Sequence, residues 1–237
     1  MSARTILDNY TPRPNWIRYL LGYFALFIGS VLTKINVKGR QFIPQQGPYI
    51  VAVNHFSYID PPFVVYALQR PITFLAASDQ AIAWYFRWAA WLYGFIPTNR
   101  TRLAPSTIKK AKHVLQTNNI LGIFPEGTST DRKLREAKRG IVYLSTINNT
   151  PILPVSIHGL LHVWPNWFKG IRPKVTVRIG KPFLPDTGVE KNLDRVTKIK
   201  TIGENTICRI AALLPEEAHG IVKGDKRIEQ FKKKNES

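Results

Sequence analysis

Residues 49–60 read YIVAVNHFSYID. The first five of them, Tyr49–Val53, are aromatic, β-branched or small and apolar, which is typical of a buried strand. A polar loop follows with His55, and a carboxylate, Asp60, comes five residues after it, directly before two prolines. The stretch predicts a strand, then a loop, then the beginning of a helix.

The alternation of strand and helix continues along the chain. Pro105 stands at an expected first helical position, before apolar residues at helical spacing, and residues 191–214 show a second such pattern. Further strands are expected at Ile72–Ala76, Ile120–Phe124, Ile152–Ile157 and Lys174–Ile179. This alternation predicts one α/β domain with a mainly parallel mixed sheet flanked by helices. Because the carboxyl ends of parallel strands lie at the same edge of the sheet, we expect the functional site at that edge.

The two ends of the chain differ from this domain, which we place at residues 37–215. In the first 36 residues, Tyr19–Thr33 is uncharged and mostly apolar. As a helix it would extend about 22 Å, less than the ~30 Å of a bilayer core. We expect it to associate with a membrane by lying in or dipping into one leaflet, with a buried soluble helix as the alternative. Residues 216–237 form an expected charged tail, solvated or frayed beyond His219.

The chain is strongly basic, with 34 Lys and Arg against 15 Asp and Glu and a net charge of +19. The positive electrostatic field of such a chain attracts nucleic acid, anionic lipids or phosphorylated cofactors, and the charge alone does not show which of these is the partner. The single cysteine, Cys208, excludes an internal disulfide and a Cys-rich metal site. We therefore expect a reducing location, at the cytoplasmic face of a membrane.

The spacing of His55 and Asp60 suits acid–base chemistry. A carboxylate that folds back onto one ring nitrogen fixes the tautomer and leaves the other nitrogen free to accept a proton. The nucleophile can then be a substrate alcohol, so that no acyl-enzyme is needed. A core histidine, or an aspartate that caps a helix, is the alternative for this pair alone.

A second motif begins at Ile120 and reads ILGIFPEGTST. The strand breaks at Pro125, exposing Glu126 and then Gly127, whose bare backbone permits close approach of a ligand. Thr128 adds a hydroxyl and an amide. The alternative is an ordinary strand-to-turn junction in which Glu126 is solvated or caps a helix.

Together these motifs resemble the glycerolipid acyltransferase family, typified by 1-acylglycerol-3-phosphate acyltransferase. The resemblance covers roughly residues 37–185 and rests on four ordered blocks, which are Asn54-His55-x4-Asp60, Gly94–Arg100, Phe124–Thr128 and Leu153-Pro154-Val155. It implies that His55 is the catalytic base and Asp60 its orienting partner. It also implies that Arg100 binds the acceptor's phosphate and that Glu126, Gly127 and Thr128 bind the acceptor.

The resemblance implies a reaction as well as a site. A fatty acyl group would pass from acyl-CoA or an acyl carrier protein to a lysophospholipid hydroxyl, with 1-acylglycerol-3-phosphate as first acceptor and phosphatidic acid as product. No cofactor and no metal are expected. Another lyso-lipid acceptor is the alternative.

Two positions depart from the family's pattern. Ser129 stands where these enzymes often have arginine, and Ala77 stands where they often have lysine. Both departures remove a cation that would contact phosphate, which leaves Arg100, Arg102, Arg132 and Lys133 available. They put the identity of the acceptor's headgroup in doubt.

Other functions explain less of the sequence. A nucleic-acid-binding module suits the charge but leaves the four blocks unexplained, and no nucleic-acid partner is expected. A zinc hydrolase is disfavoured because Gly159 stands where its His-Glu-x-x-His motif needs Glu. Acylation of Ser57 is disfavoured because the sequence has no Gly-x-Ser-x-Gly pattern around a nucleophilic serine. A lipid-binding protein without catalysis remains an alternative.

The Trp and Tyr residues within residues 81–97 favour contact with an anionic membrane surface, and packing in the core is the alternative.

Overall fold

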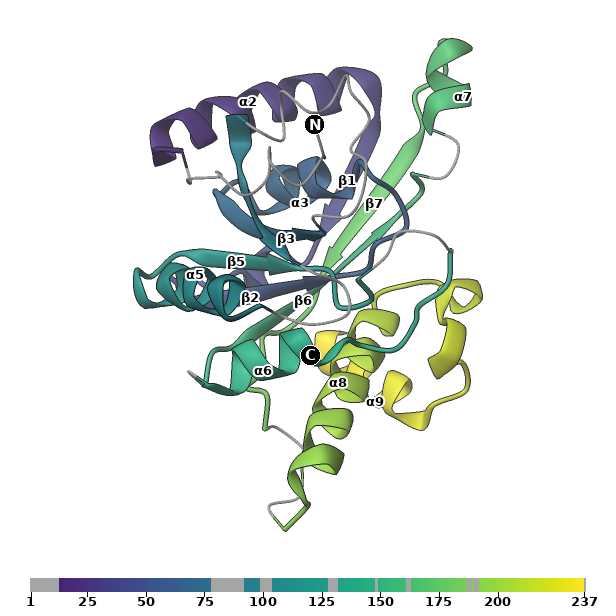
Figure 1. Ribbon diagram of the computed structural model, residues 1–237. Coiled ribbons are helices and arrows are strands. Elements are labelled where there is room, and N and C mark those ends of the chain that lie inside the picture. The colour runs from purple at the N-terminus through teal and green to yellow at the C-terminus, as the bar shows by residue number, and fades with distance from the viewer. Residues whose placement is uncertain are drawn as a thin grey trace, which may run out of the picture.

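The computed structural model describes residues 13–77, 92–98, 104–127, 132–147, 149–160, 163–186, 189 and 192–236. Its centre is a seven-stranded sheet in the order β1-β7-β6-β2-β5-β3-β4 (Figure 1). The strands are β1 (Lys34–Lys38), β2 (Tyr49–Val53), β3 (Ile72–Ala77), β4 (Phe95–Thr98), β5 (Ile120–Ile123), β6 (Ile152–His158) and β7 (Lys174–Ile179). Strands β2 to β6 are parallel, whereas β7 runs antiparallel to β6, and β1 parallel to β7. The predicted mainly parallel mixed sheet is confirmed.

The five predicted strands are present as β2, β3, β5, β6 and β7, each within one residue of its expected ends. Strands β1 and β4 are additional, and they are the two edges of the sheet. The expected boundary between residues 36 and 37 falls inside β1, so the amino-terminal segment continues directly into the sheet.

Helices cover both faces of the sheet (Figure 1). One face carries α3 (Asp60–Leu68), with α2 (Asn15–Leu32) packed against it. The other carries α5 (Pro105–Gln116), α6 (Arg139–Ile147), α8 (Arg195–Ala211) and α9 (Lys226–Glu236). A short helix, α7 (Val163–Phe168), lies between β6 and β7, and 3-10 turns occupy Arg40–Phe42, Glu216–Ala218 and Gly220–Val222.

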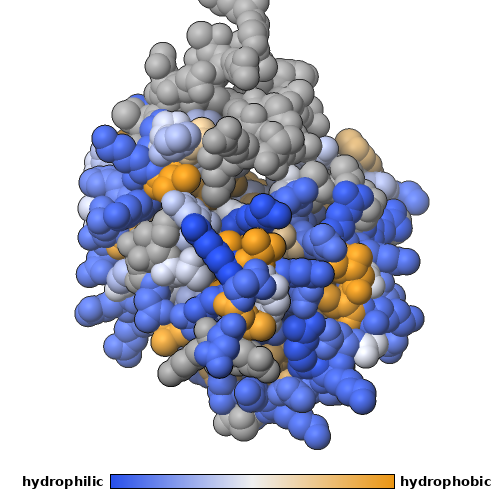
Figure 2. All heavy atoms as spheres, turned by 60° about the horizontal axis from the view of Figure 1, so that its bottom comes forward, coloured by the Kyte–Doolittle hydropathy of each residue, from blue (hydrophilic) through white to orange (hydrophobic). Residues whose placement is uncertain are grey.

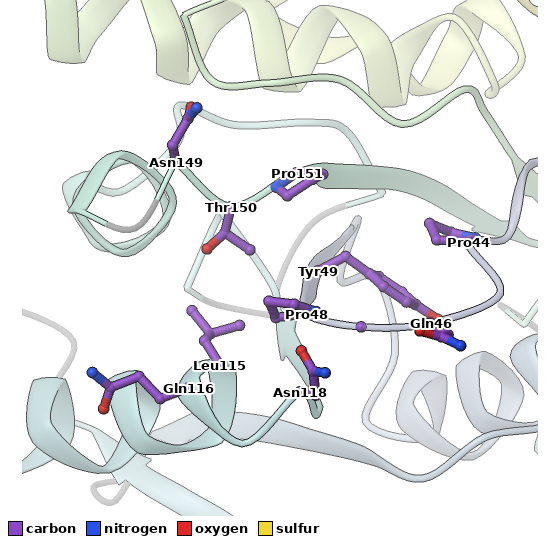
Figure 3. Close-up of a pocket in the computed structure, with 11 residues that line it drawn as sticks. Pro44, Gln46, Pro48, Tyr49, Leu115, Gln116, Asn118, Asn149, Thr150 and Pro151 are labelled. Carbon is purple, nitrogen blue, oxygen red and sulfur yellow. The ribbon is translucent and has the colours of Figure 1, made fainter.

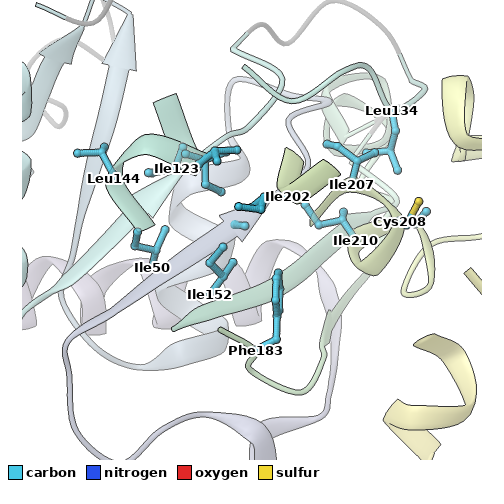
Figure 4. Packing of buried hydrophobic residues seen from close by; sticks show 14 of the residues in the cluster. Ile50, Ile123, Leu134, Leu144, Ile152, Phe183, Ile202, Ile207, Cys208 and Ile210 are labelled. Atoms are coloured by element: carbon cyan, nitrogen blue, oxygen red, sulfur yellow. The ribbon is translucent and has the colours of Figure 1, made fainter. Parts of the chain in front are cut away.

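Strand β2 is buried on both sides because its side chains alternate between two cores. Tyr49, Val51 and Val53 pack with α3, whereas Ile50 and Ala52 pack with the α8 side. Figure 4 shows the second core, where Ile50 and Ile152 of the sheet lie opposite α8. The uniformly apolar stretch that predicts β2 therefore reflects its position in the middle of the sheet.

Helix α2 packs with one face only. Gly22 lies against Val65 of α3, and the buried Arg18 donates a hydrogen bond to Thr73 Oγ1 at 3.1 Å. The opposite face exposes a helical stripe of large apolar residues, namely Trp16, Tyr19, Leu20, Tyr23, Phe24, Phe27, Ile28 and Val31. By length and composition α2 is able to cross a membrane, although only 11% of it is buried in the protein.

The predicted solvated or frayed end beyond His219 is wrong. Residues 226–236 form α9, which buries Ile228 and Phe231 against α8. The Phe231 ring lies 4.1 Å from the guanidinium carbon of Arg209, which also stacks over Phe183 at 4.0 Å. Two apolar residues three apart form one helix face, and this face stabilises a segment that is otherwise charged.

Candidate active site

The predicted His–Asp pair is formed at the carboxyl end of β2. His55 Nδ1 lies 2.9 Å from Asp60 Oδ2, and the His55 side chain is 14% exposed whereas that of Asp60 is 1% exposed. Asp60 is the first residue of α3, so the loop folds back just before the helix begins. The imidazole can therefore be held by a buried carboxylate while part of the ring stays accessible.

Asp60 Oδ2 accepts two more hydrogen bonds, from Phe56 N and Ser57 N, both at 2.9 Å. Burial raises the pKa of Asp60, and the bonds from His55, Ser57 and Phe56 oppose that rise. Because two backbone N–H groups already donate to Oδ2, this oxygen acts as an acceptor, and we assign the donor role in the third hydrogen bond to His55 Nδ1. His55 then carries its proton on Nδ1, which leaves Nε2 as the basic nitrogen.

Two neighbours that sequence reasoning did not identify fix the position of His55. The side chain of Asn54 bridges to β6, donating to Ile157 O at 3.0 Å and accepting from Ile157 N at 2.8 Å. The ring of Phe124 stacks on the imidazole with centroids 4.2 Å apart. Both residues lie in the predicted motifs, and their position directly beside a motif residue was the signal available for finding them.

Glu126 is brought to the same place from β5. Its Oε1 accepts a hydrogen bond from His55 N at 3.0 Å, and its Oε2 accepts one from Arg135 N at 3.2 Å. The side chain is only 3% exposed. Burial raises the pKa of Glu126 to about 7, against the two backbone hydrogen bonds. The structure thus shows Glu126 holding the His55 loop, with each carboxylate oxygen accepting one backbone hydrogen bond.

Of the remaining positions that the sequence analysis singled out, the structure describes Gly127 and Ala77 but not Arg100, Thr128 and Ser129. Gly127 has φ +71, a conformation in which L side chains are strained, and its N–H donates to Phe124 O at 3.1 Å to close a turn. Arg100 and Thr128 lie outside the described residues, as does Ser129. Ala77 is the last residue of β3 and therefore lies at the same edge as His55. The roles of these residues in binding an acceptor stay predictions.

Ser57 is less well placed to be a nucleophile. Its Oγ accepts a hydrogen bond from Ile59 N at 3.5 Å, and among the described residues no hydrogen bond joins it to His55. Nucleophilic serines are activated by a base within hydrogen-bonding distance. This arrangement favours a substrate hydroxyl as the nucleophile.

A cavity of about 600 Å³ lies elsewhere, at the amino ends of β2, β5 and β6 (Figure 3). It is lined by the loops that precede these strands, including Gln46, Pro48, Asn118 and Thr150. His55 and Asp60 follow the carboxyl end of β2, at the other edge of the sheet. The cavity is therefore separate from the His–Asp site, and we assign no step of the reaction to it.

The raised pKa of Glu126 predicts a pH dependence of stability. An acid whose pKa rises from 4.5 to about 7 on folding stabilises the protein when protonated, and this stabilisation is lost as the pH rises between those values. Glu126→Gln removes the titration. The free energy of unfolding of the variant minus that of the wild type should therefore increase across this window, by up to about 3 kcal/mol.

Urea unfolding at a series of pH values measures this difference. Glu136→Gln, at an exposed carboxylate, is the matched control and should show no comparable change across the window. A pH-independent difference for Glu126→Gln would contradict the assignment.

Comparisons with known proteins identify a family that matches much of the chain. The family described as Acyltransferase matches residues 34–158, a range that includes His55, Asp60 and Glu126. A 1-acyl-sn-glycerol-3-phosphate acyltransferase of Borreliella burgdorferi is 30% identical over 53% of this chain and 51% of its own length. One from Limnanthes douglasii is 27% identical over 78% of this chain and 66% of its own length.

A solved structure shares the fold. The crystal structure of the 1-acyl-sn-glycerophosphate acyltransferase PlsC from Thermotoga maritima superposes with a TM-score of 0.55 at 23% identity, covering 80% of this chain and 78% of that one. The matches to the curated relatives above span about half to two thirds of the length of those relatives.

Proposed function

The chain belongs to the acyltransferase family, and from this premise we propose that it moves a fatty acyl group from a thioester onto the hydroxyl of a lysophospholipid. The hydrogen bond between His55 Nδ1 and Asp60 Oδ2 carries the proposal. It leaves Nε2 as a base at a sheet edge, where open α/β sheets bind ligands. The first acceptor to test is 1-acylglycerol-3-phosphate, because the relatives are named for its acylation.

The proposed reaction needs one proton acceptor and one electrophile. Nε2 of His55 takes the proton of the acceptor hydroxyl as the oxygen attacks the thioester carbonyl. The tetrahedral intermediate collapses, the C–S bond breaks, and the imidazolium returns the proton to the departing thiolate. An ester and a free thiol result, and neither a metal nor a cofactor enters the balance. Asp60 stabilises the imidazolium throughout, because its buried carboxylate lies 2.9 Å away.

The donor and the acceptor's headgroup are the open choices. Acyl-CoA and acyl carrier protein both present phosphate or acidic groups that suit a chain with a net charge of +19. Arg132 and Lys133, which follow the Glu126 turn, are exposed cations that could contact them. The proposed partners are thus an acyl thioester, a lysophospholipid and an anionic membrane surface.

Incubation with a radiolabelled acyl thioester and a panel of detergent-dispersed lysolipids tests the function. The donor is offered once as acyl-CoA and once as acyl carrier protein. We expect labelled phosphatidic acid from 1-acylglycerol-3-phosphate. A labelled product from a different lysolipid alone would keep the reaction class and change the acceptor, whereas no acylated lipid from any combination would refute the proposal.

Helix α2 is the proposed membrane contact, at the cytoplasmic face. Its 18 residues extend about 27 Å, one face packs on α3, and the opposite face exposes the apolar stripe. A helix with one packed and one apolar solvent-facing side can lie in the plane of the interface. This arrangement supports the expectation that the segment lies in one leaflet.

Vesicle binding should depend on this stripe. Phe27 is 66% exposed on α2, and Phe27→Asp puts a charge where insertion needs an apolar ring. We expect roughly 10-fold or greater weakening of binding to anionic vesicles, measured by co-sedimentation. Val196→Asp, at a residue 67% exposed on α8, is the matched control and should bind like the wild type.

Salt separates the two contributions to this binding. Screening weakens attraction between the basic chain and anionic lipids, so raised salt should weaken the binding. Binding that does not respond to salt would mean that apolar insertion dominates over charge. Equal weakening by the α2 and α8 variants would contradict the role of the stripe.

A further inference from the structure

Helix α7 leaves the sheet at the edge that carries His55. It follows β6, which is parallel to β2, and the hydrogen bonds between Asn54 and Ile157 join the ends of these two strands. Val163, the first residue of α7, is fully buried. In Figure 1, α7 projects from the body of the protein on the same side as α2. Helix α7 therefore begins near the His–Asp site and lies on the same side of the protein as α2, the proposed membrane contact.

The last residue of α7 and the turn that follows it present apolar side chains to solvent. Phe168 is 89% exposed and Ile171 is 51% exposed. Backbone hydrogen bonds define the turn, since Gly170 N donates to Trp167 O at 3.0 Å and Ile171 N donates to Asn166 O at 2.8 Å. An aromatic ring held almost wholly in water by an ordered turn lacks a partner within the described part of the chain.

The turn is tied to the end of α2. Trp167 Nε1 donates to Leu32 O at 2.8 Å, and the Arg172 guanidinium donates to Thr33 O at 2.9 Å and also to Ser30 O. These bonds satisfy carbonyl groups at the carboxyl end of α2 that have no partner within the helix. Because these hydrogen bonds come from the indole of Trp167 and the guanidinium of Arg172, both of which are rigid groups, they hold the turn in a fixed position relative to the end of α2.

The charges around the turn are basic. Lys169 directly follows Phe168 in the sequence. Lys174 is the first residue of β7 and pairs with Lys34, the first residue of β1. All three lysines are exposed. A lipid surface with anionic headgroups attracts such cations and accepts apolar side chains beneath them. Tyr58, in the loop between His55 and Asp60, is also 67% exposed at this edge.

We propose that the turn formed by residues 168–172 is a second membrane contact, which inserts Phe168 and Ile171 into an anionic bilayer surface alongside α2. Two contacts that are rigidly joined restrict how the protein tilts on the bilayer more than one helix does by itself. The orientation brings the sheet edge with His55 to the lipid surface. The inference rests on the proposed function, because a lipid acceptor is what would enter at that edge.

A fluorophore at position 168 tests the contact directly. Cys208 is the only cysteine and is fully buried, so Phe168→Cys offers one accessible thiol for an environment-sensitive nitrobenzoxadiazole label. We expect its emission to shift to the blue and to increase several-fold on addition of phosphatidylcholine–phosphatidylserine vesicles. Wild-type protein carried through the labelling gives the background from Cys208.

The matched control carries the label at Val196→Cys, at the beginning of α8 and at the opposite end of the molecule from α2 (Figure 1). Figure 2 brings this end forward and shows mainly hydrophilic side chains with small separate hydrophobic groups. Emission from position 196 should stay unchanged while both labelled proteins co-sediment with vesicles. Unchanged emission from position 168 in the bound protein would overturn the proposal, as would equal shifts at the two positions.

A second variant makes the test independent of the label. Phe168→Ser should weaken vesicle binding roughly 10-fold, and Ile221→Ser, at a residue 59% exposed beyond α8, should not. Equal affinity of the Phe168 variant and the wild type would overturn the proposal. No measurement here uses an acyl donor or turnover, so failure of the membrane contact and failure of the proposed reaction are distinguishable.

Discussion

His55→Ala is expected to reduce the rate of acyl transfer by about 100- to 10,000-fold, the usual contribution of a positioned general base. The side chain of Ala cannot accept the proton of the attacking hydroxyl. The fold should survive, because the bond to Glu126 comes from the backbone N–H of His55, which the substitution keeps. The rate is measured with labelled acyl donor and a detergent-dispersed lysolipid.

Three controls separate loss of the base from loss of structure. Circular dichroism should show the wild-type content of secondary structure, and vesicle binding should be unchanged. Added imidazole should restore part of the activity, because a free base can occupy the space that the ring leaves beside Phe124. Turnover close to that of the wild type would show that His55 is not the base.

Asp60→Asn should have an effect of similar size. In the Ser-His-Asp template, the corresponding change costs about 10,000-fold in kcat while leaving the geometry intact. The amide oxygen of Asn can still accept from Phe56 N and Ser57 N, so the loop is kept. What is lost is the negative charge that stabilises the imidazolium, because the amide oxygen that replaces Oδ2 is neutral.

The expected signature is a fall in kcat with little change in KM for the acceptor. Asp225→Asn is the matched control, because Asp225 is also a paired carboxylate, bonded to Arg227 Nη2 at 2.6 Å, but it lies directly before α9. That variant should lose stability without losing turnover. A fall in activity that only follows the fall in unfolding temperature in both variants would assign Asp60 a structural role alone.

The two strands that sequence reasoning did not predict lie at the edges of the sheet. β1 reads KINVK, with only Ile35 and Val37 directed inward, and its partner β7 follows it by more than a hundred residues. β4 reads FIPT, and proline is tolerated in a strand only at an edge or bulge. Strands with one neighbour bury less surface, so their sequences carry a weaker pattern than β2.

The error at the carboxyl end has a related cause. Composition predicts a solvated tail because most residues between Lys223 and Ser237 are charged or polar. Ile228 and Phe231 are too few to indicate a core-packed helix by themselves. Their partners, Arg209 and the residues around it on α8, become neighbours only after the chain folds.

The sequence by itself determined the central strands and the pairing of His55 with Asp60. Both depend on near neighbours, since a fully buried strand must be apolar and a carboxylate five residues from an imidazole can reach it within one loop. Tertiary structure alone decided what holds that loop. Glu126 is 71 residues from His55, and Asn54 is 103 residues from Ile157, so these hydrogen bonds exist only because parallel strands end together at one edge of the sheet. A local pattern cannot specify such pairs, because their geometry is set by the register between strands.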